Sequence, residues 1–155
     1  MCGAAFASAI EPERSPGSSA PEFKERAKQV AEIEKQLSLA ISKRDTDFLQ
    51  KVLAETYFDA YEGEKHALSK ADTLARCKAG LLHFLAVERE PRTSSEGDFI
   101  AVEGFAKLIP NRKDDVAPEE QWVHVRRLWT KKDGNWVLTG QIRRLEGDDG
   151  KGEVD

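Results

Sequence analysis

The chain has 155 residues, enough for one domain with a hydrophobic core and too few for two domains of ordinary size. Charged residues make up 34% of it, the mean hydropathy is -0.58, and no run approaches the roughly 18 apolar residues that a membrane helix needs. The net charge of -4 argues against a nucleic-acid partner, because nucleic-acid-binding proteins usually carry a basic excess that neutralises phosphates.

Residues 1–21 are expected to lie outside the fold. They begin with a small, apolar stretch that ends in an Ala-x-Ala triplet at 7–9, and the remainder is rich in Pro, Ser and Gly. This pattern resembles the end of a secretory signal peptide, although the charged start and most of the apolar centre are missing. Two interpretations stay open: an exported or periplasmic protein whose true start lies upstream, and a cytoplasmic protein with a disordered tail.

The next part of the chain is predicted to be helical. Apolar residues recur every three or four positions between 22 and 44, which is typical of one long amphipathic helix. Asp45 or Thr46 can cap a second, short helix. A third helix is expected to begin after Ser69, because Ser69 and Asp72 have the spacing of a capping box.

The strands follow an alternating pattern. A short strand before the third helix places Tyr57, Asp59 and Tyr61 on one face. Four longer strands are predicted at about 83–94, 98–109, 120–131 and 135–145. Helices gathered first and strands last indicate an α+β domain, with three helices packed on a curved, mainly antiparallel sheet. We place this domain at 22–146 and expect the acidic, Gly-rich residues 147–155 to form a disordered tail.

The last two strands are predicted to form a β-hairpin around Asp133 and Gly134, a dipeptide that favours a type I′ turn. A two-residue turn fixes the register, and the register decides which side chains share a face. Counting outward from the turn gives one mixed polar face, with Trp122, His124, Arg126, Leu128, Thr139, Gln141 and Arg143. The other, mostly apolar face holds Val123, Val125, Trp129, Leu138 and Ile142, together with Arg127.

Three motifs occur in a fairly specific order. They are the segment 40–45 before the second helix, Gly63 followed by 68–74, and the hairpin from 127 to 141. In this order they resemble the nuclear transport factor 2-like superfamily, in particular its SnoaL-like branch and related bacterial domains of unknown function. The resemblance covers about 23–145 and implies a cone-shaped α+β barrel. It implies no single function, because this fold hosts isomerases, hydrolases, cyclases, binding domains and oligomerisation modules.

The resemblance also implies roles for the two hairpin faces. In this superfamily the concave side of the sheet and the helices enclose a conical pocket, while the convex side often forms a dimer. The polar face would then line the pocket, and the apolar face would form a homodimer surface. The residue pattern alone favours the reverse arrangement, since antiparallel sheets usually turn their apolar face to the core. The predicted ligand-binding residues are Tyr57, Tyr61, Trp122, His124, Arg126, Thr139, Gln141 and Arg143.

Catalytic residues are harder to assign. Asp59 is the best candidate for a general base, and a surface or capping carboxylate is its alternative. His124 beside Arg126 could hold an anionic or carbonyl group, and a polar ladder facing water is the alternative. The later strands offer no inward Asp of the kind that isomerases of this fold use. The three histidines are scattered and no Cys-x-x-Cys spacing occurs, so we expect neither a metal nor another cofactor.

Three hypotheses follow, in order of support. The first is a small-molecule-binding domain with a conical pocket. The second is a homodimeric interaction module that uses the convex sheet. The third is an enzyme of the isomerase, cyclase or hydrolase type that uses Asp59 and His124.

Overall fold

The computed structural model describes residues 20–108 and 121–145. In this part of the chain there are three helices: α2 (Ala20–Ser42), α3 (Thr46–Val52) and α4 (Lys70–Ala79). The strands are β1 (Leu53–Tyr61), β2 (Leu68–Ser69), β3 (Arg89–Glu96), β4 (Phe99–Lys107), β5 (Trp122–Lys132) and β6 (Asn135–Leu145). The predicted tail at 147–155 lies outside the described residues, as does most of the tail predicted at 1–21. Ala20 and Pro21 are instead the first residues of α2.

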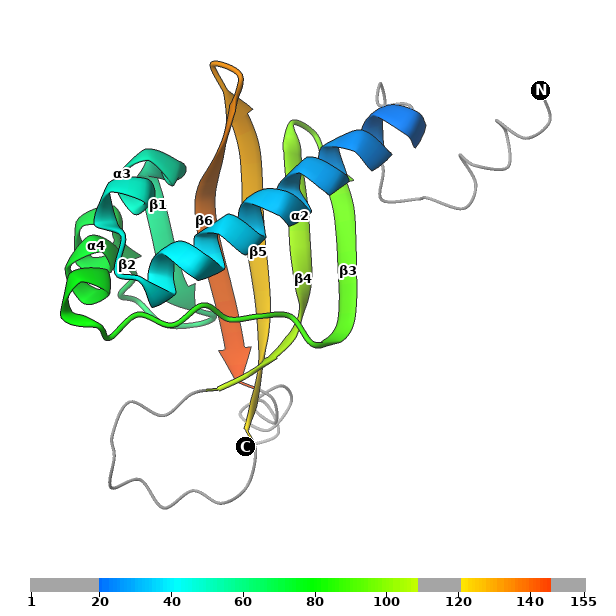
Figure 1. The fold of residues 1–155 in the computed structure, drawn as a ribbon. Helices are drawn as coiled ribbons and strands as arrows, with labels where there is room; N and C mark the ends of the chain where they lie inside the picture. The colour runs from blue at the N-terminus through cyan, green and yellow to red at the C-terminus, as the bar shows by residue number, and fades with distance from the viewer. Residues whose placement is uncertain (1–19, 109–120, 146–155) are drawn as a thin grey trace, which may run out of the picture.

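The strands form one sheet in the order β2-β1-β6-β5-β4-β3, and α2 crosses its face diagonally while α3 and α4 cover the β1 end (Figure 1). All neighbouring strands are antiparallel except β1 and β6, which run parallel. The predicted α+β fold, with three helices on a mainly antiparallel sheet, is therefore confirmed. The sheet is open rather than closed into a barrel, because its edge strands β2 and β3 do not pair with each other. No helix in the described ranges combines the length and the apolar content needed to cross a membrane.

Local signals place the helix starts correctly. Asp45 caps α3, since its side chain accepts a hydrogen bond from the Phe48 amide at 3.1 Å. Ser69 and Asp72 form the predicted capping box of α4, each side chain accepting from the other residue's backbone amide. At its other end α4 stops at Gly80, whose φ of 77° is the left-handed conformation that favours glycine.

The strand predicted at 83–94 begins later, at Arg89. The preceding segment 81–88 lies over the helix-covered face of the sheet, and Leu85 is buried there. The Leu85 carbonyl accepts a hydrogen bond from the Arg127 side chain at 2.9 Å. At its end the segment joins the sheet, where the Glu88 amide donates to the Phe105 carbonyl of β4 at 2.8 Å. Its apolar residues precede this bond and belong to a covering segment and not to a strand.

The hairpin turn forms as predicted. Asp133 and Gly134 both have positive φ angles, of 54° and 82°, as a type I′ turn requires. Trp129 lies opposite Leu138, which is the register that counting from the turn predicts.

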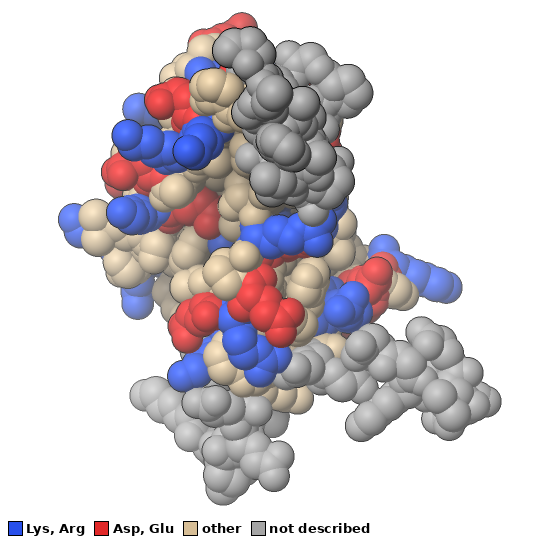
Figure 2. All heavy atoms as spheres, turned by 90° about the vertical axis from the view of Figure 1, so that its right-hand side faces the viewer, with Lys and Arg blue, Asp and Glu red and all other residues tan. Residues whose placement is uncertain are grey.

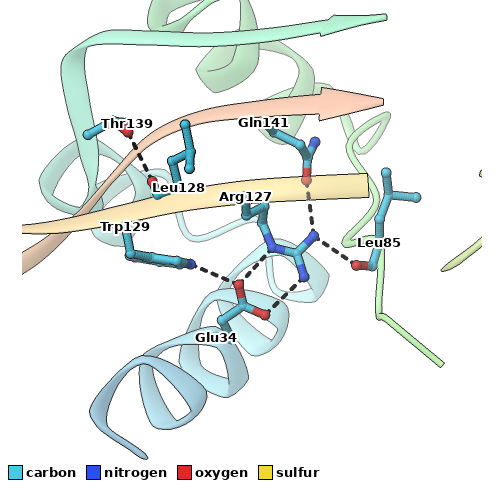
Figure 3. A network of polar contacts seen from close by, with 7 residues as sticks. All are labelled: Glu34, Leu85, Arg127, Leu128, Trp129, Thr139 and Gln141. Carbon is cyan, nitrogen blue, oxygen red and sulfur yellow. Dashed lines mark hydrogen bonds and ion pairs between the residues drawn. The ribbon is translucent and has the colours of Figure 1, made fainter. Parts of the chain in front are cut away.

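Beyond this pair the register of β6 changes. Leu128 pairs with Gly140, so Thr139 is an extra residue, a β-bulge. The Thr139 hydroxyl donates to the Leu128 carbonyl at 3.0 Å and so occupies an acceptor of the neighbouring strand (Figure 3). As a result, Gln141 pairs with Arg127 and not with Arg126, and every later residue of β6 faces the side opposite to the predicted one.

The predicted assignment of the β5 faces is wrong. Val123, Val125 and Trp129 were expected on the outer, dimer-forming surface, but each is fully buried on the inner face. Trp129 and Leu138 belong to the core beneath the helices, and Val123 and Val125 pack in a second core cluster with Leu85. These four residues are therefore buried within one chain and cannot form a dimer surface. The default preference of an antiparallel sheet for an apolar inner face prevails here. Of the predicted dimer residues, Ile142 lies on the outer face, opposite Arg126.

Candidate functional site

A buried ion pair joins α2 to the middle of the sheet. The side chain of Arg127 is 1% exposed and donates to both carboxylate oxygens of Glu34, from Nε at 2.7 Å and from Nη2 at 2.9 Å. Its Nη1 donates to the Leu85 carbonyl and to Gln141 Oε1 at 3.1 Å, and Trp129 Nε1 donates to Glu34 at 2.8 Å (Figure 3). Four of the five N–H groups of this guanidinium thus donate to partners within the chain, so the network joins the helix, the covering segment and the sheet.

This pair was not predicted from the sequence, although a signal existed. Glu34 occupies an apolar-periodic position of the long helix, and Arg127 interrupts the apolar face of β5. One acidic and one basic residue, each at a core position of a different element, can be buried only as partners.

The network also fixes the orientation of the Gln141 side chain. Arg127 can only donate hydrogen bonds, so the amide oxygen of Gln141 must face it. The amide nitrogen therefore points the other way. It has no hydrogen-bond partner among the described residues, so it is available as a donor.

A cavity of about 100 Å³ lies beyond Gln141, where β1 and β6 run parallel. α4 and the covering segment 81–85 close it on the side facing the helices. Its polar and charged wall consists of Asp59, Tyr61, Arg76, His83, Gln141 and Arg143. The parallel pairing places Asp59 directly beside Gln141 and Tyr61 beside Arg143, so two distant parts of the chain supply one wall.

Asp59 and Arg143 are the central charged pair of this wall. Asp59 is 4% exposed, and Arg143 Nε lies 3.0 Å from its Oδ1. The Nε–H is not directed at the oxygen, so the contact is an ion pair without a hydrogen bond, and both buried atoms lack a hydrogen-bond partner in the described structure. The Arg143 guanidinium stacks at 4.3 Å from the Tyr61 ring centroid, and its Nη1 donates to the Tyr61 hydroxyl at 3.4 Å. The Nε of Arg144, which does not line the cavity, is likewise buried without a hydrogen-bond partner in the described part of the chain.

Tyr57 lies deeper on the same strand. It is buried and lines a smaller cavity of about 30 Å³, together with Asp59 and Gln141. Burial raises the pKa of the Tyr57 phenol, and the negative charge of Asp59 raises it further. The phenol is therefore protonated across the physiological pH range.

Several predicted site residues lie on the opposite side of the sheet. Gln141 pairs with both Asp59 and Arg127, so these residues share the inner face. His124 is three positions from Arg127 on the same strand and therefore points outward, where its ring packs edge-on against Phe105 with the centroids 5.1 Å apart. The hypothesis that Asp59 and His124 act as a pair is wrong, because the sheet lies between them.

Trp122 and Arg126 share this outer face, and Thr139 lies in the bulge. Arg126 forms ion pairs with Glu96 and Glu103, which is the polar ladder weighed as an alternative. The hydrogen bond that Arg126 donates to the Glu96 carboxylate is the main cause that raises the pKa of Arg126. The predicted placement of Trp122, His124 and Arg126 in the pocket is therefore wrong, because β5 turns its apolar residues inward.

Two other residue classes give no site within the described ranges. No group of three or more His, Cys, Asp or Glu residues there is close enough to hold a metal ion. Cys77 is buried in the core, and burial raises the pKa of its thiol. On the side of the molecule that carries β3, the basic and acidic side chains of the described residues are intermixed (Figure 2) and form no extended basic patch for a polyanion.

Solved structures of low sequence identity share this arrangement. A nuclear transport factor 2-like protein from Cytophaga hutchinsonii is 18% identical, with a TM-score of 0.62 over 77% of this chain and 97% of its own. A second such protein, with a cystatin-like fold, from Novosphingobium aromaticivorans is 12% identical, with a TM-score of 0.57 over 89% and 97%. The chain has the nuclear transport factor 2-like fold.

This result confirms the predicted resemblance at the level of the fold. Another similar structure, a nuclear transport factor 2-like protein of unknown function from Silicibacter pomeroyi, is 15% identical, with a TM-score of 0.54 over 79% of this chain and 98% of its own. Neither a protein-family model nor a curated protein matches the sequence. The nuclear transport factor 2-like fold alone does not specify a function, which depends on the residues that line the cavity.

Proposed function

We propose that this protein binds a small polar molecule in the cavity around Asp59 and Arg143. The observation that carries the proposal is the cavity of about 100 Å³ whose wall contains the ion pair of Asp59 and Arg143. A ligand that donates a hydrogen bond to the Asp59 carboxylate and accepts one from the Arg143 guanidinium would interact with both charges.

The other groups on the wall define the ligand further. Gln141 presents its amide nitrogen as a donor, and the Tyr61 hydroxyl accepts from Arg143, which leaves its own proton free to donate. The three donors of the wall, Arg143, Gln141 and Tyr61, suit a ligand with a carboxylate or carbonyl group. The carboxylate of Asp59 suits a hydroxyl or amino group on the same ligand. The cavity of about 100 Å³ limits the ligand to the volume of a few water molecules of about 30 Å³ each, so a two- or three-carbon hydroxy acid or amino acid fits best.

Thermal unfolding with glycolate, lactate and glycine tests this proposal. At about a hundredfold excess over its Kd, a ligand stabilises the folded state by about 2.7 kcal/mol, which raises Tm by several degrees. We expect Arg143→Met to abolish the shift, because the ligand loses its main charged donor. Arg144→Met is the matched control, since Arg144 is the next residue of β6 and points to the outer face. We expect it to keep the shift.

Two results would contradict the proposal. One is the absence of stabilisation by any small hydroxy acid or amino acid. The other is an equal shift in wild type and Arg143→Met, which would place the ligand elsewhere. Asp59→Asn adds a second check, because it replaces the acceptor charge while it keeps the shape of the wall.

A homodimer stays a proposal; it would use the outer face of the sheet, as predicted, but of the predicted dimer residues it would include Ile142 and not the buried Val123, Val125, Trp129 and Leu138. None of the helices in the described ranges covers the outer face of the sheet (Figure 1), and Trp122, Leu128 and Ile142 are only half-buried there. We expect Leu128→Asp to weaken self-association at least about tenfold in sedimentation equilibrium, because it places a charge in an apolar contact. Leu39→Asp, on the exposed side of α2, is the matched control. A wild-type chain that is monomeric at high concentration would contradict this proposal.

A further inference from the structure

A groove separate from the cavity around Asp59 runs along α2. Its volume is about 450 Å³, and it lies between α2 and the part of the sheet formed by β3 and β4. The helix wall includes Ala31, Lys35 and Ser38, and the covering segment contributes Phe84 and Val87. Pockets that bind small molecules usually measure about 300–1,000 Å³, so this groove has the size of a ligand site.

The groove and the cavity lie at opposite ends of the hydrogen-bond network around Arg127. Glu34 lines the groove, Gln141 lines the cavity, and Arg127 bonds to both. The carboxylate of Glu34 already accepts hydrogen bonds from Arg127 and Trp129. Its charge is therefore compensated from within the protein, and it does not exclude an anion from the groove.

The remaining lining combines apolar surface with one cation. Ala27 and Ala31 are one helical turn apart, and their small side chains leave the helix wall hollow. Phe84, Val87 and Val102 provide larger apolar contacts opposite. No hydrogen bond or ion pair joins Lys35 to another residue of the described chain, so its ammonium group is free to bind an anion at the edge of the groove.

We propose that this groove binds an amphipathic carboxylate, a molecule with an apolar body of medium length and one anionic end. The body lies between the alanines of α2 and the residues Phe84, Val87 and Val102. Lys35 holds the carboxylate through a charge-assisted hydrogen bond, with the Ser38 and Thr93 hydroxyls nearby as further donors.

Titration calorimetry of the full chain with decanoate, kept below its micellar concentration, tests this site. Ala31→Trp fills the groove with an indole, and we expect it to abolish binding. Ala31 is exposed on α2, so the larger side chain does not disturb the core. Leu39→Trp is the matched control, because it adds the same indole on α2 at a position 55% exposed and outside the groove. We expect it to bind decanoate as the wild type does.

A second pair of variants tests the role of the charge. Lys35→Glu should weaken decanoate binding about tenfold, the size of one charge-assisted hydrogen bond. Lys43→Glu makes the same change beyond the end of α2 and should have no effect. Decanol, which has the same chain without the charge, should bind wild type and Lys35→Glu equally.

Decanoate binding that survives Ala31→Trp, or no decanoate binding at all, would overturn the assignment. Decanoate binding that is equally strong in wild type and Lys35→Glu would overturn the role of Lys35. Arg143→Met should leave decanoate binding unchanged, because Arg143 lies in the other cavity. The groove and the small-ligand cavity therefore pass or fail these tests independently.

Discussion

Glu34→Met is expected to lower the free energy of unfolding by about 3–5 kcal/mol, the usual cost of leaving a buried charge without its partner. The charge left behind is that of Arg127, whose side chain is 1% exposed. Urea unfolding monitored by tryptophan fluorescence measures the loss. The double variant Glu34→Met/Arg127→Met should recover most of the stability, because two apolar side chains of similar length replace the ion pair.

Arg126, the residue before Arg127 on β5, provides a matched control. Arg126 also forms ion pairs, but its side chain is 28% exposed on the outer face. Arg126→Met should therefore change stability by no more than about 1 kcal/mol, as is typical of exposed pairs. If Glu34→Met costs as little as Arg126→Met, the Arg127 charge is hydrated in solution and the helix is held by apolar contacts alone.

Trp129→Ala is expected to cost about 3–5 kcal/mol, because it leaves a large void in a close-packed core. The Trp129 ring is fully buried between the sheet and α2, and its Nε1 bonds to Glu34. The loss should be the same at every protein concentration, since it arises within one chain. Trp129→Asp should prevent stable folding altogether.

This experiment separates the two assignments of the β5 faces. If Trp129 belonged to a dimer surface, Trp129→Asp would give a folded monomer, and the stability of the wild type would depend on concentration. Trp122→Ala on the outer face is the control, and it should cost clearly less than Trp129→Ala because Trp122 is only half-buried. A folded Trp129→Asp monomer would contradict the inner placement of Trp129.

The elements that local rules specify could be predicted from the sequence. The capping box of α4, the turn at Asp133 and Gly134, and the alternation that places Asp59 beside Tyr61 on one face all depend on neighbouring residues. Long-range pairing could not be predicted in this way. The parallel contact of β1 with β6 brings Asp59 to Gln141 across more than half of the chain, and no local pattern specifies it.

The hairpin faces were misassigned for two different reasons. On β5 the apolar pattern predicts that Val123, Val125 and Trp129 are buried, whereas the resemblance to a pocket-forming superfamily predicts that they lie on the outer surface. The structure agrees with the apolar pattern. On β6 the count from the turn was correct up to Leu138 and wrong beyond it, because a single threonine hydroxyl creates a bulge there. Gln141 was therefore expected in the pocket together with His124, whereas in the structure it lies on the inner face and His124 lies outside.

The bulge has a consequence for how the length of this hairpin can vary. Leu138 and Gly140 pair with neighbouring residues of β5, so Thr139 occupies no rung of the ladder. A chain that loses Thr139 keeps each flanking residue on its own side, with Gln141 still directed at the cavity. The loss of Gly140 would instead move Thr139 onto the rung opposite Leu128, where a Cβ would collide with the Phe58 ring. We therefore expect related sequences to vary in length at Thr139, because a residue can be lost there without a change in the direction of the side chains that follow.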